Sequence, residues 1–156
     1  MALFYAGSLV LGAATGADDP LRPLSRNSTA VAESKATSFQ RVRNSAELDA
    51  AVAAAAARGE RVMLEFYADW CVSCKVMERR VFRDPAVAAR LGRLTLLQAD
   101  ITANTVDDRA LLGRFTLFGP PAMLFFGTDG REIVAARLMG ETDVAGFIAH
   151  LDRHGL

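Results

Sequence analysis

The chain has 156 residues, which is enough for one ordinary domain and too few for two. Its 18 Lys and Arg balance its 18 Asp and Glu, so neither nucleic-acid binding nor an acidic disordered tail is indicated. Hydrophobic residues make up 51% of the sequence, so a sizeable core can form. The two cysteines lie three residues apart, too close to staple a fold but close enough to form one reversible ring.

The first 17 residues are apolar and carry no charge. They are slightly short for a membrane span, which needs about 20 apolar residues, and they lack the positive start of an export signal. We favour the end of a transmembrane helix, with an atypical export signal and a buried helix as alternatives. Residues 18–38 are rich in Asp, Pro, Ser, Asn and Thr, which predicts a linker between this segment and a domain at 39–156.

From residue 39 onward, strand and helix patterns alternate. The candidate strands are short apolar runs bounded by turn residues: 39–42, 62–67, 94–101, 122–126 and 132–138, the last two as a hairpin. The candidate helices begin at polar capping residues or at the cysteines: 45–58, 71–82 with a restart at 84–91, 105–114 and 142–150. Asn44 or Ser45 is the expected cap of the first, with Glu47 completing a capping box after Asn44, and Asp84 followed by Pro85 is the expected cap of the restart. The predicted order is β-α-β-α-β-α-β-β-α, an α/β architecture.

The stretch YADWCVSCK at 67–75 is the most informative part of the sequence. A buried strand leads directly into a helix whose first turn carries both sulfurs. The N-terminus of a helix stabilises a thiolate, so Cys71 is the expected nucleophile, with its pKa pulled below that of a free thiol. Cys74 lies one turn further along the helix, where it can attack a mixed disulfide and release the product.

Two acidic residues flank the cysteines. Glu65 lies on the preceding strand, and Glu78 lies one helical turn after Cys74. A nearby carboxylate disfavours the thiolate and raises its pKa, and either acid could carry the proton that Cys74 exchanges. The alternative for Glu78 is a surface side chain paired with Lys75 or Arg79.

A strand that runs into a CxxC helix resembles the thioredoxin signature, and the predicted element order is that of the thioredoxin fold. The resemblance implies a central mixed sheet flanked by helices. It also implies that Pro121 follows Pro120 through a cis peptide bond, faces the cysteines and lies where substrate backbone pairs. Trp70 is expected to be a partly exposed lid beside Cys71. Trp70, Pro120 and Pro121 are therefore candidate substrate contacts.

A closer resemblance rests on YADWCVSCK, on FRDP at 82–85 and on FGPPAMLFF at 118–126, with DPLRPL at 19–24 as a junction. Together these motifs resemble the C-terminal periplasmic domain of the DsbD family of transmembrane disulfide reductases. The resemblance implies a protein-disulfide reductase that receives electrons from a membrane-embedded cysteine pair and passes them to a second periplasmic domain. It implies an inner-membrane location facing the periplasm, no bound organic cofactor, and a tuning role for Glu65 and Glu78.

Other interpretations are a free-standing, membrane-anchored thioredoxin-like protein and a non-catalytic metal- or protein-binding module on the same scaffold. A zinc site would need His150 and His154 as its other ligands, but these histidines lie far from the cysteines in the sequence. We expect them instead at the exposed end of the last helix. A copper-carrying CxxC module would have another strand–helix order. The later phenylalanines are expected mostly in the core: Phe115, Phe118, Phe125 and Phe126.

Overall fold

The computed structural model describes residues 37–156, and the structural statements that follow concern this part of the chain. The expected apolar segment at 1–17 and almost all of the expected linker at 18–38 lie outside the described residues. Between residues 37 and 156, no helix has the length and apolar character to cross a membrane.

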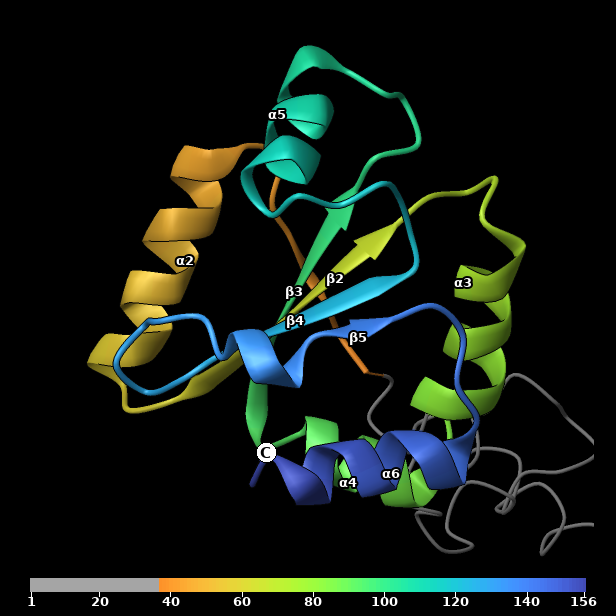
Figure 1. Cartoon of the computed structure of the whole chain (residues 1–156). Coiled ribbons are helices and arrows are strands. Elements are labelled where there is room, and N and C mark those ends of the chain that lie inside the picture. The colour runs from red at the N-terminus through yellow and green to blue at the C-terminus, as the bar shows by residue number, and fades with distance from the viewer. Residues whose placement is uncertain (1–36) are drawn as a thin grey trace, which may run out of the picture. The chain divides into compact units, whose positions relative to one another are not determined.

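A five-stranded mixed sheet forms the centre of the fold, in the order β1-β3-β2-β4-β5 (Figure 1). The central strand β2 pairs in parallel with β3 and antiparallel with β4. Every residue of β2 after the first is buried, which explains its nearly continuous apolar sequence. The strands are β1 (Gln40–Arg41), β2 (Arg61–Tyr67), β3 (Leu94–Asp100), β4 (Ala122–Phe126) and β5 (Leu138–Met139).

Helices cover both faces of this sheet, and the side chains of β2 alternate between the two cores. Leu64 and Phe66 pack with α2 and α5, whereas Met63 packs with α4, α6 and the helical segment that follows the cysteines. The helices are α2 (Ser45–Ala57), α3 (Val72–Met77), the π-helix η2 (Glu78–Phe82), α4 (Pro85–Leu91), α5 (Val106–Arg114), the 3-10 turn η3 (Val134–Ala136) and α6 (Val144–Arg153).

The predicted starts of α2 and α4 are confirmed by their capping bonds, whereas α6 begins at Val144 with Asp143 as its cap rather than at Thr142. The Asn44 side chain accepts the N–H of Glu47 at 2.9 Å, whereas the Glu47 carboxylate accepts the backbone N–H of Arg43 rather than that of Asn44. Asp84 caps α4 with Pro85 in the first turn, and this restart separates α4 from the preceding π-helix.

The predicted return strand at 132–138 is wrong. Glu132 forms a single bridge to Phe126, after which the chain turns through η3, and the strand that pairs with β4 is the short β5. The turn buries Ala136 completely and directs Arg137 to the Glu132 carboxylate. A partly buried ion pair and a fully buried alanine therefore stabilise a turn at residues where the sequence predicted an alternating strand.

The loop that leads from α5 towards β4 begins at a left-handed residue. Thr116 has φ 56°, its N–H donates to Gly113 O at 3.1 Å, and Leu117 N–H donates to Leu112 O at 2.9 Å. These two bonds form a Schellman motif, in which the left-handed position is usually glycine. A β-branched residue is strained there because its Cβ crowds the backbone.

We therefore expect Thr116→Gly to be more stable than Thr116→Ala by about 1 kcal/mol, despite the greater entropy that glycine loses on folding. Urea unfolding of the oxidised chain measures the difference. The control is Ala89→Gly in the exposed face of α4, which should destabilise by about 1 kcal/mol. Equal stabilities of the two Thr116 variants would show that the left-handed residue carries no strain.

Candidate active site

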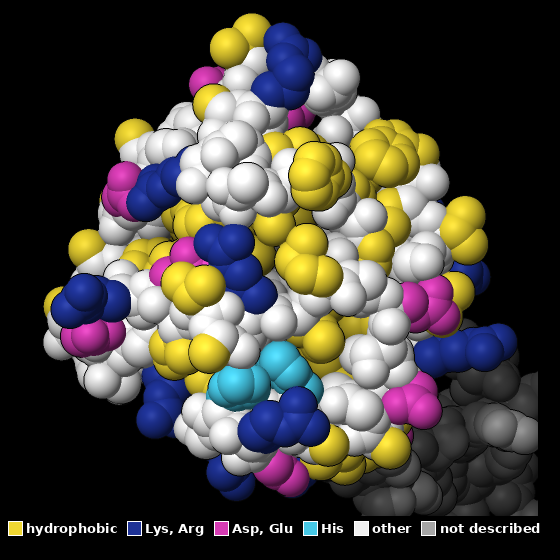
Figure 2. Space-filling view, in the orientation of Figure 1, with side chains coloured by type: hydrophobic (Ala, Val, Ile, Leu, Met, Phe, Trp, Pro, Cys, Tyr) yellow, Lys and Arg dark blue, Asp and Glu magenta, His cyan; other side chains and the backbone are white. Residues whose placement is uncertain are grey.

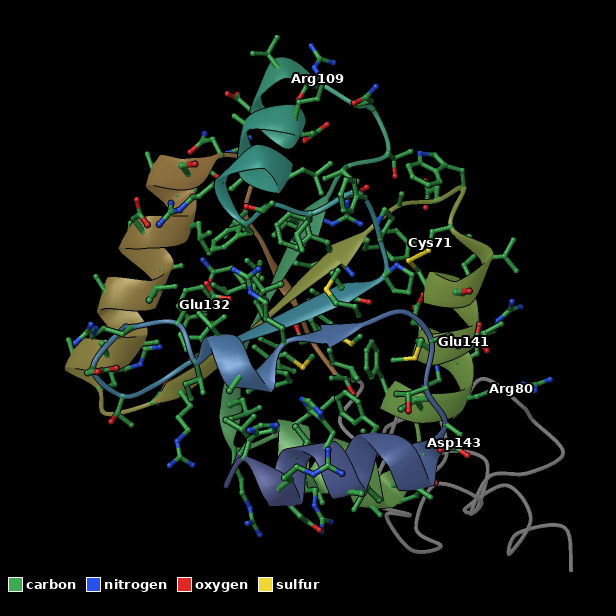
Figure 3. The ribbon with its side chains drawn as sticks, in the orientation of Figure 1. Cys71, Arg80, Arg109, Glu132, Glu141 and Asp143 are labelled. Carbon is green, nitrogen blue, oxygen red and sulfur yellow. A yellow bond between two sulfur atoms is a disulfide. The ribbon has the colours of Figure 1, made fainter. Side chains whose placement is uncertain are left out.

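The two cysteines lie where β2 passes into α3, and they form a disulfide (Figure 3). Cys71 is the N-cap of α3, and its sulfur accepts the N–H of Cys74 at 3.1 Å. Cys71 is 7% exposed and Cys74 is fully buried. Cys71 is therefore the outer cysteine of the ring and Cys74 the inner one, so Cys71 is better placed to meet a partner.

Glu65 is buried in the central strand, on the same face of β2 as Met63 and thus on the side covered by η2. Its carboxylate accepts one hydrogen bond, from Gln98 Nε2 at 2.8 Å. Burial raises the pKa of Glu65 to about 7; the Gln98 hydrogen bond opposes this shift, and the charge of Glu78 adds to it. Near neutral pH this carboxyl group can either hold or release a proton.

Gln98 is a site residue that the sequence analysis missed. It lies opposite Glu65 in the parallel register of β2 and β3, which places its amide beside the buried carboxylate. A single glutamine inside an apolar strand was the available signal, but the pairing register was needed to connect it with Glu65.

Glu78 begins the π-helix directly after α3 and is about half exposed. It pairs with neither Lys75 nor Arg79 but with Arg83, at 3.9 Å. The two partners are five positions apart along the chain, which is the spacing that a π-helix brings onto one face. Glu78 therefore combines a loose surface ion pair with an electrostatic effect on Glu65.

Trp70 is 60% exposed immediately before Cys71, and its indole N–H donates to Thr102 O at 3.4 Å. Lys75, on α3, is not a free surface residue. Its ammonium donates to the Tyr67 hydroxyl at 3.0 Å and lies 3.6 Å from Asp69. This hydrogen bond to Tyr67 is the main reason why the pKa of Lys75 is raised.

The peptide bond between Pro120 and Pro121 is cis, as expected. Ala122, the next residue, pairs with Phe66 near the end of β2. The antiparallel register therefore places Pro121 at the same end of the sheet as the loop that carries the cysteines.

Phe118, expected in the core, is instead fully exposed, whereas Phe115, Phe125 and Phe126 are buried. Phe118 lies in the loop just before the cis-proline. Met139, which is 51% exposed, lies on β5 and pairs with Ala122, the residue just after the cis-proline. Figure 2 shows hydrophobic side chains reaching the surface in the upper right of the view, where Figure 1 places the start of α3 and the loop before β4. An exposed apolar surface of this kind is typical of a protein-binding site.

His150 is buried rather than exposed, which corrects the expectation for the end of the last helix. Its Nε2 lies 2.8 Å from Ala136 O, and its ring packs against Phe125. Within residues 37–156, no group of three or more His, Cys, Asp and Glu side chains is placed to hold a metal ion.

Comparison with known proteins agrees with this geometry. The sequence model of a thioredoxin-like family matches residues 43–128. The chain is 49% identical to the thiol:disulfide interchange protein DsbD of Ralstonia nicotianae over 97% of its own length, and 46% identical to DsbD 2 of Pseudomonas aeruginosa over 94%. In both cases it spans 26% of the relative.

Among solved structures, the oxidised C-terminal domain of Neisseria meningitidis DsbD superposes with a TM-score of 0.63 at 34% identity, covering 73% of this chain and 98% of that domain. A thioredoxin from Thermus thermophilus superposes with a TM-score of 0.59 at 26% identity, covering 76% of this chain and 88% of that thioredoxin.

The fold and the CxxC disulfide at the start of α3 define a thioredoxin-like thiol–disulfide oxidoreductase domain. More specifically, the chain belongs to the DsbD family, as its C-terminal thioredoxin-like domain.

The raised pKa of Glu65 makes a stability prediction for the oxidised chain. The folded carboxyl group binds its proton more tightly than the unfolded one, so its stabilisation is complete below about pH 4.5 and is lost as pH rises through about 7. Between pH 5 and 8 we expect the free energy of unfolding to fall by about 2–3 kcal/mol.

Glu65→Gln should remove most of this slope, because the amide keeps a polar partner for Gln98 but does not titrate. Urea unfolding at several pH values measures it, with Glu141→Gln at an exposed position as control. A slope that survives in Glu65→Gln would show that another group causes it.

Proposed function

We propose that this domain relays pairs of electrons between protein thiols and disulfides through Cys71 and Cys74. The observation that carries the proposal is the asymmetric ring at the N-terminus of α3, in which Cys71 is slightly exposed and Cys74 is fully buried. The pair itself stores the two electrons, so the relay needs no bound organic cofactor.

In the forward step, the Cys71 thiolate attacks one sulfur of a partner disulfide. The partner's S–S bond breaks, a mixed disulfide forms at Cys71, and the released partner thiolate takes up a proton. Cys74 then loses its proton and attacks the Cys71 sulfur, which breaks the mixed disulfide and releases the second partner thiolate. The domain is oxidised to the ring seen here, and the partner is reduced by two electrons.

Glu65 is proposed as the group that exchanges the proton of Cys74. Its pKa of about 7 allows both protonation states at neutral pH, and its burial shields this exchange from bulk water. Glu78 is proposed to tune this step through its charge, since it interacts with Glu65 across the face covered by η2.

Docking of the partner chain is proposed to use Trp70, Pro120, Pro121 and the exposed Phe118. The backbone ahead of the cis-proline is where an extended substrate segment would pair. Pro120 has no N–H, so its backbone can only accept a hydrogen bond from the partner, through its carbonyl oxygen. Apolar contacts with Trp70 and Phe118 would then supply much of the affinity.

The proposed donor is a membrane-embedded cysteine pair and the proposed acceptor a second periplasmic domain, with this domain held at the bacterial inner membrane and facing the periplasm. Support comes from the DsbD relatives, of which this chain spans only 26%, so that other parts of those proteins could supply both partners. The expected membrane association of residues 1–17 agrees with this location.

The roles of the two sulfurs predict opposite behaviour of their serine variants. Cys74→Ser should accumulate mixed disulfides with protein partners, because Cys71 still attacks but nothing resolves the adduct. Cys71→Ser should form none and should lose exchange activity. Non-reducing electrophoresis after incubation of each reduced variant with a disulfide-bonded protein such as insulin measures both, and trapped adducts in Cys71→Ser alone would reverse the assignment.

A further inference from the structure

The Asp69 carboxylate in the loop between β2 and Cys71 contacts the Tyr67 hydroxyl and Lys75, and the backbone of this loop is held by the turn that follows β3. The Tyr67 carbonyl accepts from Ile101 N–H at 2.8 Å, and the next bonds both end on Thr102. Asp69 N–H donates to Thr102 Oγ1 at 2.8 Å, and the Trp70 indole N–H donates to Thr102 O. One threonine therefore contacts both the backbone and the exposed aromatic side chain that precede the outer sulfur.

The orientation of the Thr102 hydroxyl follows from its other partner. Asp100 accepts both the N–H of Thr102, at 3.0 Å, and its O–H, and it forms an ion pair with Arg41 on β1. These bonds lower the pKa of Asp100 despite its partial burial, so its carboxylate is ionised and can only accept. The hydroxyl proton therefore points to Asp100, and an oxygen lone pair is left to face Asp69 N–H.

Trp70 has little packing to fix its position, because 60% of its surface is exposed. Its orientation depends on its own bond to Thr102 and on the backbone of the loop, which the Thr102 hydroxyl holds. Because this exposed indole directly precedes Cys71, we expect a protein partner docked at Cys71 to contact it and a small disulfide to depend on it less.

We propose that Thr102 is a positioning residue that fixes Trp70 beside Cys71 and thereby favours protein disulfides over small ones. The proposal rests on the proposed function, because it assigns a determinant of partner recognition to the same site. Thr102 touches no reacting atom, and it acts through the loop from Ala68 to Trp70.

Three variants of the 156-residue chain separate this role from a general loss of structure. Thr102→Val keeps the shape of the side chain but removes the hydroxyl, and Thr102→Ser restores the hydroxyl. The matched control is Thr95→Val at the other end of β3, where the Thr95 hydroxyl likewise donates to a carboxylate, that of Glu60. This control removes an equivalent bond far from the cysteines.

The first measurement is quenching of tryptophan fluorescence by acrylamide, which reports on Trp70 alone because the chain has a single tryptophan. We expect the quenching constant to change in Thr102→Val and to match that of the unchanged chain in Thr102→Ser and Thr95→Val. An unchanged constant in Thr102→Val, or the same change in Thr95→Val, would overturn the proposal. This measurement needs no exchange activity.

The second measurement compares rates of oxidation of the reduced chain by insulin and by oxidised glutathione. In Thr102→Val we expect the insulin rate to fall about fivefold, the factor that one hydrogen bond is worth, and the glutathione rate to change less than about twofold. Thr102→Ser should restore the insulin rate. Equal losses with both disulfides would contradict a role in partner recognition.

The two proposals fail in different ways. If the unchanged chain reacted with neither disulfide, the proposed function would fail, and partner recognition by Thr102 would fail with it. If the unchanged chain reacted with both and Thr102→Val behaved like it, only the role of Thr102 would be wrong.

Discussion

The direct passage from the central strand β2 into helix α3 is the constraint on which the site depends. Strand β2 is fixed on both sides, by β3 in parallel and by β4 in antiparallel pairing. Only three residues separate the end of β2 from Cys71, which caps α3, so this short connection places Cys71 at a helix N-terminus. The cis-proline before β4 reaches the same end of the sheet because β4 pairs with that same strand.

We propose that two opposing electrostatic effects act on sulfur chemistry at this junction. The N-terminus of α3 favours a thiolate, whereas a buried carboxylate disfavours one. Glu65 keeps a single hydrogen-bond partner in Gln98, and its environment holds its proton up to about neutral pH. A site balanced in this way suits a domain that exchanges electrons with docked partners rather than with every disulfide it meets.

The sequence was sufficient where neighbouring residues carry the structure. The CxxC motif, the caps at Asn44 and Asp84 and the buried run of β2 all depend on short spacings, and each was confirmed. Contacts between segments far apart in the chain were missed because they require the tertiary fold: the β2–β3 register places Gln98 beside Glu65, and the turn after β3 places Thr102 beside Trp70. Residue type alone also misplaced Phe118 and His150, since burial is decided by the tertiary fold.

The most direct test of this account is the rate at which Cys71 of the reduced chain is alkylated, measured against pH with iodoacetamide. The account predicts a midpoint above the value of about 7 known for thioredoxin, because the buried carboxylate opposes the helix N-terminus. It also predicts a lower midpoint in Glu65→Gln, where that charge is absent. A midpoint at or below 7 that Glu65→Gln leaves unchanged would contradict the account.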